Sequence, residues 1–253
     1  MTDVGQIEKM VRKHFIFEGA VRIDPNTGEV SCASYMKLRS RMDELPVSFS
    51  EVKGYFDCSH AGLKTLKGSP HTVGGNFMCA YNDLEYLIGG PKVVKKGYFC
   101  QRNQLKSLKG IPDNLLFLNC NNNKLTSLLG GPKIVTDYYE CAENPLVSLE
   151  GAPKSTGTMY CANTDLRSMY GMPRTITKSL LLTVHPNTRL LDLLFVQEIE
   201  EFVFYPPGKT DIDHRLRDLE AIFMRYKGQG YDAMPACAAR MAKAGYGSNA
   251  RMG

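Results

Sequence analysis

Residues 74–91 read GGNFMCAYNDLEYLIGGP, and this stretch decides the fold because variants of it recur along the chain. The recurrence is marked most plainly by its cysteine, which returns at intervals of 20 or 21 residues. The six cysteines concerned are Cys58, Cys79, Cys100, Cys120, Cys141 and Cys161. An internal period of this length is typical of solenoids, in which each repeat forms one turn and packs only on its neighbours. The spacing therefore predicts a solenoid of six turns, which we call rungs.

Other residues recur at fixed distances from the cysteine, and we number these positions relative to it. Position −2 is aromatic or aliphatic: Phe56, Phe77, Tyr98, Leu118, Tyr139 and Met159. Position +5 holds Leu63, Leu84, Leu105, Leu125, Leu146 and Leu166, and position +8 holds Leu66, Leu87, Leu108, Leu128, Leu149 and Met169. Positions +10 and +12 are glycine and proline in every rung, as in Gly89 and Pro91. Four rungs carry asparagine at +3: Asn82, Asn103, Asn123 and Asn144.

Each column has a physical reading. Positions −2 and 0 share one face of a short strand, so their side chains point into the core together. The leucines at +5 and +8 close the turn over that core, and the asparagine can satisfy backbone groups of the turn. Glycine permits unusual dihedrals in the return loop, and proline fixes φ there. Because one rung cannot bury its apolar face alone, we expect an α/β repeat with one parallel sheet of short strands.

These residues match the leucine-rich-repeat pattern LxLxxNxL, with cysteine in the second leucine position. The chain more closely resembles the repeat proteins of tailed bacteriophages, whose rungs look like GGxFxCxxNxLxSLxGxP; residues 74–91 are nearly such a rung. Residues 23–30, followed by Leu45 and Pro46, also resemble the entry segment of those proteins. The resemblance covers about two thirds of the chain. It implies a leucine-rich-repeat solenoid and little about function, because most such relatives have no assigned role.

A solenoid exposes its core at both ends, so caps are expected there. We expect an N-terminal cap over residues 1–50, with a helix through Val4–Phe15, a strand at 21–23 and a glycine-containing turn at 25–28. This cap includes a degenerate first rung, because Cys32 has no leucine at +5 or +8. The six rungs then occupy residues 51–180.

Residues 181–253 are expected to form a helical C-terminal cap, although an independent docking module is the alternative. Residues 180–184 can add a last strand. Helices are predicted at 190–201, 211–226 and 231–244 from their apolar spacing and the intervening Pro and Gly residues. The terminal residues 245–251 are predicted to be flexible.

The cysteine column is best explained as a stack of small apolar core residues. Zinc sites need clustered ligands, and no two cysteines here are closer than 20 residues. Disulfides between rungs are conceivable but disfavoured in a reducing cytoplasm. We expect a cytoplasmic protein, because the N-terminus lacks the pattern of a signal peptide and no apolar run reaches the ~18 residues of a membrane span.

Positions −3, −1 and +1 point away from the core, onto the sheet face where repeat proteins usually bind. Large side chains gather there: Tyr55, Met78, Phe99, Phe117, Tyr138 and Tyr160. Only two acids and no base accompany them in the six rungs. Exposed aromatic residues are enriched at interfaces, which predicts a partner-binding surface. Two alternatives stay open: the caps can fold over this face, or the aromatic residues simply favour strands.

Lysines collect in the turns and return loops instead: Lys64, Lys67, Lys92, Lys95, Lys96, Lys106, Lys109, Lys133 and Lys154. A solvated convex side explains them, and an edge that contacts phosphates is the alternative. The net charge of +5 permits an acidic partner without requiring one.

No catalytic site is predicted. The five histidines His14, His60, His71, His185 and His214 are scattered, and no phosphate-binding glycine motif is present. Cys237, the only cysteine beyond the rungs, lies in an Ala-rich segment that looks packed. We therefore expect no enzymatic activity, no cofactor and no metal.

These features favour a phage-encoded module that binds a host or phage protein through the sheet face, as an adaptor or inhibitor. A structural component of the virion is one alternative. A nucleic-acid-binding protein that uses the lysine edge is the other, and no contact with a membrane is expected. The sequence indicates neither the partner nor the oligomeric state.

Overall fold

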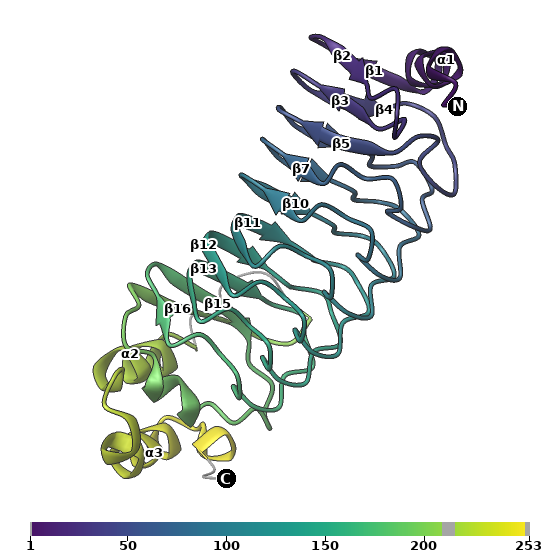
Figure 1. The fold of residues 1–253 in the computed structure, drawn as a ribbon. Coiled ribbons are helices and arrows are strands. Elements are labelled where there is room, and N and C mark those ends of the chain that lie inside the picture. Colours follow the sequence, from purple (N-terminus) through teal and green to yellow (C-terminus); the bar gives the residue numbers. More distant parts are fainter. Residues whose placement is uncertain (1, 209–215, 251–253) are drawn as a thin grey trace. The chain divides into compact units, whose positions relative to one another are not determined.

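The computed structural model describes residues 2–208 and 216–250. The chain divides into two compact units, and each is described by itself. Unit 1 comprises Met1–Lys124 and Gly130–Pro132, and unit 2 comprises Leu125–Leu129 and Lys133–Gly253. Both consist of stacked turns whose strands run parallel, and the turns number about eight in all (Figure 1). The prediction of a repeat solenoid is confirmed.

Unit 1 begins with a helix and continues in strands. The first elements are α1 (Val4–His14), β1 (Phe15–Phe17), β2 (Val21–Ile23), β3 (Val30–Cys32), β4 (Met36–Leu38) and β5 (Phe49–Val52). The others are β6 (Phe56–Asp57), β7 (Thr72–Val73), β8 (Phe77–Met78), β9 (Val93–Val94), β10 (Gly97–Phe99) and β11 (Asn114–Asn119). One sheet has the order β1-β4-β6-β8-β10-β11, and a second has the order β2-β3-β5-β7-β9. Among the described strands of unit 1, the β1–β4 and β2–β3 pairs are antiparallel and the others are parallel.

The prediction of one sheet is wrong, because each rung has a second strand-forming position. At +15 from the cysteine stands a buried residue: Val73, Val94, Leu115, Val135, Thr156 or Ile176. In unit 1, Val73 and Val94 pair in the second sheet. Cys32 lies in this same column, because the register pairs it with Val52 and Val52 with Val73. It is therefore not a member of the cysteine column of the main sheet.

A further rung precedes Cys58, with methionine and leucine in place of the aromatic residue and cysteine. Met36 pairs in register with Phe56, which aligns Leu38 with Cys58. Both side chains are buried. The α1 helix that precedes this rung is confirmed, and the Asp3 side chain caps it by accepting a hydrogen bond from the N–H of Gln6 (3.0 Å).

Unit 2 contains the strands β12 (Ile134–Glu140), β13 (Ser155–Cys161), β14 (Thr175–Ile176), β15 (Ser179–Thr183) and β16 (Glu201–Tyr205). Its helical elements are η1 (Leu191–Phe195), α2 (Arg217–Tyr226), η3 (Gly230–Ala233), α3 (Met234–Lys243) and η4 (Gly247–Ala250). The sheet order is β12-β13-β15-β16, with β14 also paired to β13. The strand predicted at 180–184 is confirmed by β15.

The repeat itself contains no helix, so the expected α/β repeat is wrong in its helical part. Residues 18–189, all of which the structure describes, form strands, turns and bends. The glycine at +10 explains why the return loop does not continue into a helix. Its φ is positive in all six rungs, whereas a right-handed helix needs a negative φ. At Gly151 a Cβ atom would lie 2.3 Å from the backbone nitrogen of Leu129, so the loop also needs the missing side chain.

The core columns are otherwise as predicted. The residues at −2, 0, +5 and +8 have at most 1% of their surface exposed in every rung. The asparagines at +3 are buried, and each bonds to the backbone of two rungs. Asn82 accepts hydrogen bonds from the N–H groups of Ala61 and Leu63 and donates to the carbonyls of Cys58 and Cys79. This side chain therefore joins consecutive turns as well as closing its own.

All eight cysteines are buried and free of disulfides. Burial raises the pKa of the Cys161 thiol to about 12 and that of Cys237 to about 11. These thiols are therefore neutral near pH 7 and pack as apolar groups.

The helix predicted over 190–201 is wrong. Only the short turn η1 forms, and the chain then enters β16. Phe202 and Phe204 alternate with outward residues, and they pair in register with Leu180 and Leu182. Their period of two extends the buried columns of the sheet, which outweighs the helical spacing of the preceding residues. Glu198 and Glu201 consequently do not share a helix.

The remaining C-terminal helices follow the prediction closely. The α2 helix matches the segment predicted at 211–226 from Arg217 onward, and residues 211–215 lie outside the described chain. Together, η3 and α3 match the helix predicted at 231–244. The segment predicted to be flexible includes the short turn η4, in which Asn249 is only 3% exposed. Its amide donates to the carbonyls of His185 (2.8 Å) and Thr188 (2.9 Å).

Candidate functional site

The candidate site in unit 1 is the outward surface of β4, β6, β8, β10 and β11, which we call the unit 1 face. Side chains alternate along each short strand, so positions −2 and 0 are buried while −3 and −1 point outward. The register aligns Met78 with Phe99 on neighbouring strands, and Gly97 with Phe117. Each of these three large side chains is only partly exposed. The strands therefore hold apolar groups side by side at the surface.

A glycine explains how the ring of Phe99 lies on this face. A Cβ atom on Gly97 would lie 2.6 Å from Cε2 of Phe99 and 3.2 Å from Cβ of Phe117. The Phe99 ring thus lies over its own strand, in the space that the missing side chain of Gly97 leaves. The N–H of Gly97 donates to Oδ1 of Asn76 (3.0 Å), which fixes the neighbouring strand in place.

Toward the N-terminal rungs the unit 1 face carries a stacked aromatic pair and an ion pair. The rings of Tyr35 and Tyr55 are 4.7 Å apart and nearly parallel. Desolvation raises the pKa of Tyr55, and the neighbouring Tyr35 adds to this shift. Lys37 and Asp57 form an ion pair of 3.2 Å, and Asp57 also accepts a hydrogen bond from the N–H of Ser59.

A shallow depression of about 360 Å³ opens on this face between the ion pair and the aromatic residues. It is lined by Lys37, Asp57, Ser59, His60, Asn76, Met78, Ala80, Tyr81, Phe99 and Gln101. Its wall therefore combines two large apolar side chains with charged and amide groups. Such a mixture suits an apolar anchor that is surrounded by polar contacts.

Position +2 forms a second column at the edge of the depression. His60 stacks on Tyr81 with ring centroids 4.2 Å apart, and the guanidinium of Arg102 lies 5.4 Å from the centre of the Tyr81 ring. All three residues have a left-handed backbone, with φ between 55° and 58°. Residues other than glycine rarely adopt this conformation, because their Cβ atom clashes with the backbone. The chain thus keeps large side chains where glycine would fit with less strain.

The structure brings four of the six predicted residues together on the unit 1 face: Tyr55, Met78, Phe99 and Phe117. Only Met78 and Phe99 line the depression. The sequence reasoning missed Tyr35, which belongs to the degenerate rung, and His60 and Tyr81, which stand at +2. A signal for the last two was present, because position +2 holds a polar or aromatic residue in all six rungs.

Tyr138 and Tyr160 lie on the outward surface of unit 2. Tyr138 is 43% exposed, and the ammonium of Lys178 lies 5.2 Å from the centre of its ring. Lys178 also pairs with Asp137 at 2.6 Å. Tyr160 contacts Tyr205 edge to face at 6.5 Å, and desolvation together with Tyr205 raises its pKa. Two bases, Lys37 and Lys178, lie beside the predicted residues, although neither stands at position −3, −1 or +1 of the six rungs.

The lysines of the return loops partly pair with acids. Lys64 pairs with Asp43, and Lys106 pairs with Glu85, each at 2.8 Å. All four side chains are more than half exposed, so these pairs contribute little to stability. They nevertheless reduce the positive charge that the lysine edge offers to phosphates.

Residues 2–208 and 216–250 contain neither a metal-binding cluster nor a membrane-spanning helix. No group of three or more His, Cys, Asp or Glu side chains in this part of the chain is arranged to hold a metal ion. No helix there is long and apolar enough to span a membrane. Of the five histidines, His214 lies outside the described residues.

No protein-family model, no curated protein and no solved structure matches this chain.

Proposed function

We propose that the chain is a leucine-rich-repeat protein of the tailed-bacteriophage type, and that it binds another protein through the unit 1 face. The observation that carries this proposal is the depression around Met78 and Phe99. A solvated strand surface is normally covered with charged and small polar residues. Here, two large apolar side chains lie in a hollow with a rim of polar groups, as at the centre of protein interfaces.

The partner offers an apolar anchor to Met78 and Phe99, and polar groups to the side chains that surround them. Asp57 and Lys37 form an ion pair, so their charges compensate each other. They therefore fix the register of a partner without adding a strong net charge. The column of His60, Tyr81 and Arg102 adds flat side chains at the edge of the depression. Large rigid side chains of this kind provide contact area at a low cost in conformational entropy.

The proposed setting is the cytoplasm of a bacterial host, where the protein acts as an adaptor or inhibitor rather than as an enzyme. In this proposal α1 and the C-terminal helices cap the two ends of the repeat. Binding of nucleic acid by the lysine edge is the weaker candidate, because Lys64 and Lys106 already pair with acids.

Capture experiments from host lysate test the proposal. The wild-type chain is compared with a Met78→Ala, Phe99→Ala variant in about 0.3 M salt, where phosphate-driven binding is strongly weakened. The control variant, Tyr86→Ala with Ile88→Ala, removes two side chains that are 50% and 60% exposed outside the unit 1 face. The proposal expects one protein to be retained by wild type and control and lost by the first variant. Retention of nucleic acid alone, or equal capture by all three chains, contradicts it.

The composition of purified virus particles distinguishes a structural role in the virion from the proposed one. Mass spectrometry of purified particles would detect the chain as a stoichiometric component in that case. Its absence from particles, combined with capture of a host protein, agrees with the proposed role in the cytoplasm.

A further inference from the structure

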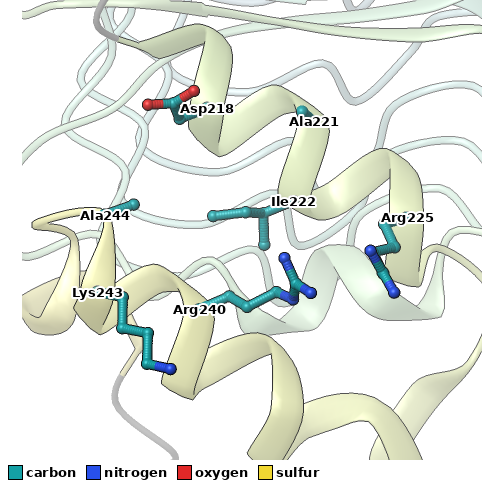
Figure 2. A pocket seen from close by; sticks show the side chains of 7 residues that line it. All are labelled: Asp218, Ala221, Ile222, Arg225, Arg240, Lys243 and Ala244. Atoms are coloured by element: carbon teal, nitrogen blue, oxygen red, sulfur yellow. The ribbon is translucent and has the colours of Figure 1, made fainter.

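We propose that a groove between α2 and α3 in unit 2 binds a phosphate monoester with an apolar body. The groove has a volume of about 600 Å³. Figure 2 shows the side chains that line it. It is lined by Asp218, Ala221, Ile222, Arg225, Arg240, Lys243 and Ala244. Three of these side chains are cations, and they come from two different helices. This site is separate from the unit 1 face and does not depend on the function proposed for that face.

One tyrosine organises the two arginines. The Nε–H of Arg240 donates to the hydroxyl oxygen of Tyr226 at 3.0 Å, and the guanidinium of Arg225 lies 5.9 Å from the centre of the same ring. The Nε–H bond orients Arg240 while leaving its terminal nitrogen atoms available for a ligand. A guanidinium held in this way forms paired hydrogen bonds to the oxygen atoms of a phosphate.

The charges of the groove are unevenly distributed along it. Asp218 and Lys243 lie toward one end, whereas Arg225 and Arg240 lie toward the other (Figure 2). The end of the groove that holds Arg225 and Arg240 therefore carries two positive charges. Among the described residues, none of these three cations forms an ion pair with a carboxylate. An anion is therefore favoured beside Tyr226 and not beside Asp218.

Helix dipoles alone do not explain this arrangement. Arg225 stands in the last turn of α2, and Arg240 and Lys243 stand in the last turn of α3, where cations are favourable. That effect explains their position along each helix. It does not require that the cations of two helices line one groove, or that both arginines contact one tyrosine.

The apolar part of the lining indicates the rest of the ligand. Ile222 lies between the two helices, and the small Ala221 and Ala244 leave space beside it (Figure 2). A free phosphate would contact the arginines only. Ile222 is only 9% exposed, so a phosphate ester with a flat or aliphatic body would cover mainly the exposed Ala221 and Ala244 and the edge of Ile222. We expect it to bind more tightly than the inorganic ion for this reason.

Titration of the full chain with phenyl phosphate tests the site, by calorimetry or by amide chemical shifts of α2 and α3. Inorganic phosphate and potassium chloride at matched ionic strength are the comparison ligands. We expect saturable binding of phenyl phosphate, weaker binding of inorganic phosphate and none of chloride. Arg225→Gln and Arg240→Gln are each expected to weaken binding by about tenfold or more, because each removes charge-assisted hydrogen bonds.

Two further variants separate a specific site from general electrostatics. Arg217→Gln removes the same charge from an exposed position of α2 outside the groove and is expected to leave binding unchanged. Tyr226→Phe keeps the ring but removes the acceptor for Arg240, and is expected to weaken binding several-fold at an unchanged unfolding temperature. The proposal is overturned if the wild-type chain shows no saturable binding, or if Arg217→Gln weakens it as much as Arg225→Gln does.

Discussion

The side-chain oxygen Oδ1 of Asn103 accepts a hydrogen bond of 3.0 Å from the backbone N–H of Leu84, in the preceding rung. The amide nitrogen of the same side chain donates to the carbonyls of Cys79 and Cys100. One buried side chain thus satisfies backbone groups of two successive turns. The same column recurs at Asn82, Asn123 and Asn144, each of which bonds in this way to a neighbouring turn.

Replacing Asn103 by alanine is expected to destabilise the protein by about 2–4 kcal/mol, because one N–H and two carbonyl groups lose their partner inside the core. The free energy of unfolding in urea measures this loss. The control is Gln104→Ala, at the exposed neighbouring position, which we expect to change stability by less than about 0.5 kcal/mol. Similar stability of both variants would show that the asparagine column does not hold the rungs together.

The left-handed residues at +2 are expected to store strain. Glu143 has a φ of 53° and a side chain that is not fully buried. Glu143→Gly is expected to raise the free energy of unfolding by about 0.5–1 kcal/mol, because relief of the clash exceeds the entropy that glycine loses on folding. Glu143→Ala keeps the Cβ atom and should give no such gain. If the alanine variant is as stable as the glycine variant, backbone strain is not the cause.

The buried thiols predict a loss of stability in alkali. The pKa of Cys161 is about 12 in the folded chain and 9.0 without burial, so the unfolded chain loses this proton first as pH rises. The stabilising contribution is complete below pH 9 and is lost as pH rises from 9 toward 12. For each such thiol, the free energy of unfolding falls by about 1.4 kcal/mol per pH unit in this range.

Urea unfolding at pH 8 and pH 10 measures this effect in the wild-type chain and in Cys161→Ala. The variant lacks one titrating thiol, so its stability should fall less between the two pH values, by about 1.4 kcal/mol. Equal losses in the two proteins would exclude Cys161 as the titrating group.

The end of the described chain is expected to stabilise unit 2. Asn249→Ala removes the amide that donates to His185 and Thr188 and leaves both carbonyls without this donor. We expect a loss of about 1–3 kcal/mol and faster proteolysis after Lys243. Ala244→Ser, at an exposed neighbouring position, serves as the control and should resemble the wild-type chain. Equal protease resistance of all three proteins would mean that the C-terminal turn is not held by Asn249.

The sequence predicted those parts of the fold in which one position keeps one residue type. The same amino acid recurs at several positions of the repeat: cysteine at 0, leucine at +5 and +8, and asparagine at +3. The physical role of each position follows directly from its residue type. The second sheet was missed because position +15 is filled by valine, leucine, threonine or isoleucine, which pack equally well there. A degenerate first rung was expected within residues 1–50, but its core residues Met36 and Leu38 were not identified, since only the register with Phe56 reveals them.

The errors near the C-terminus have another cause. The segment before Glu201 has helical spacing, but pairing of Phe202 with Leu180 depends on a sheet edge that only the folded chain provides. Likewise, nothing local in residues 245–250 indicates that Asn249 meets carbonyl groups about sixty residues earlier in the chain. Of the candidate site, the outward apolar residues could be predicted. The depression could not, because it depends on how the ring of Phe99 lies over Gly97.

The central claim is that a protein partner binds the depression on the unit 1 face, and the affinity of the identified partner tests it most directly. Calorimetry would compare the wild-type chain with Met78→Ala, Phe99→Ala and with the control Tyr86→Ala, Ile88→Ala. We predict at least about 30-fold weaker binding for the first variant, which corresponds to the loss of an interface hot spot, and an unchanged dissociation constant for the control. Unchanged affinity of the first variant, at an unfolding temperature equal to that of the wild-type chain, would contradict the claim.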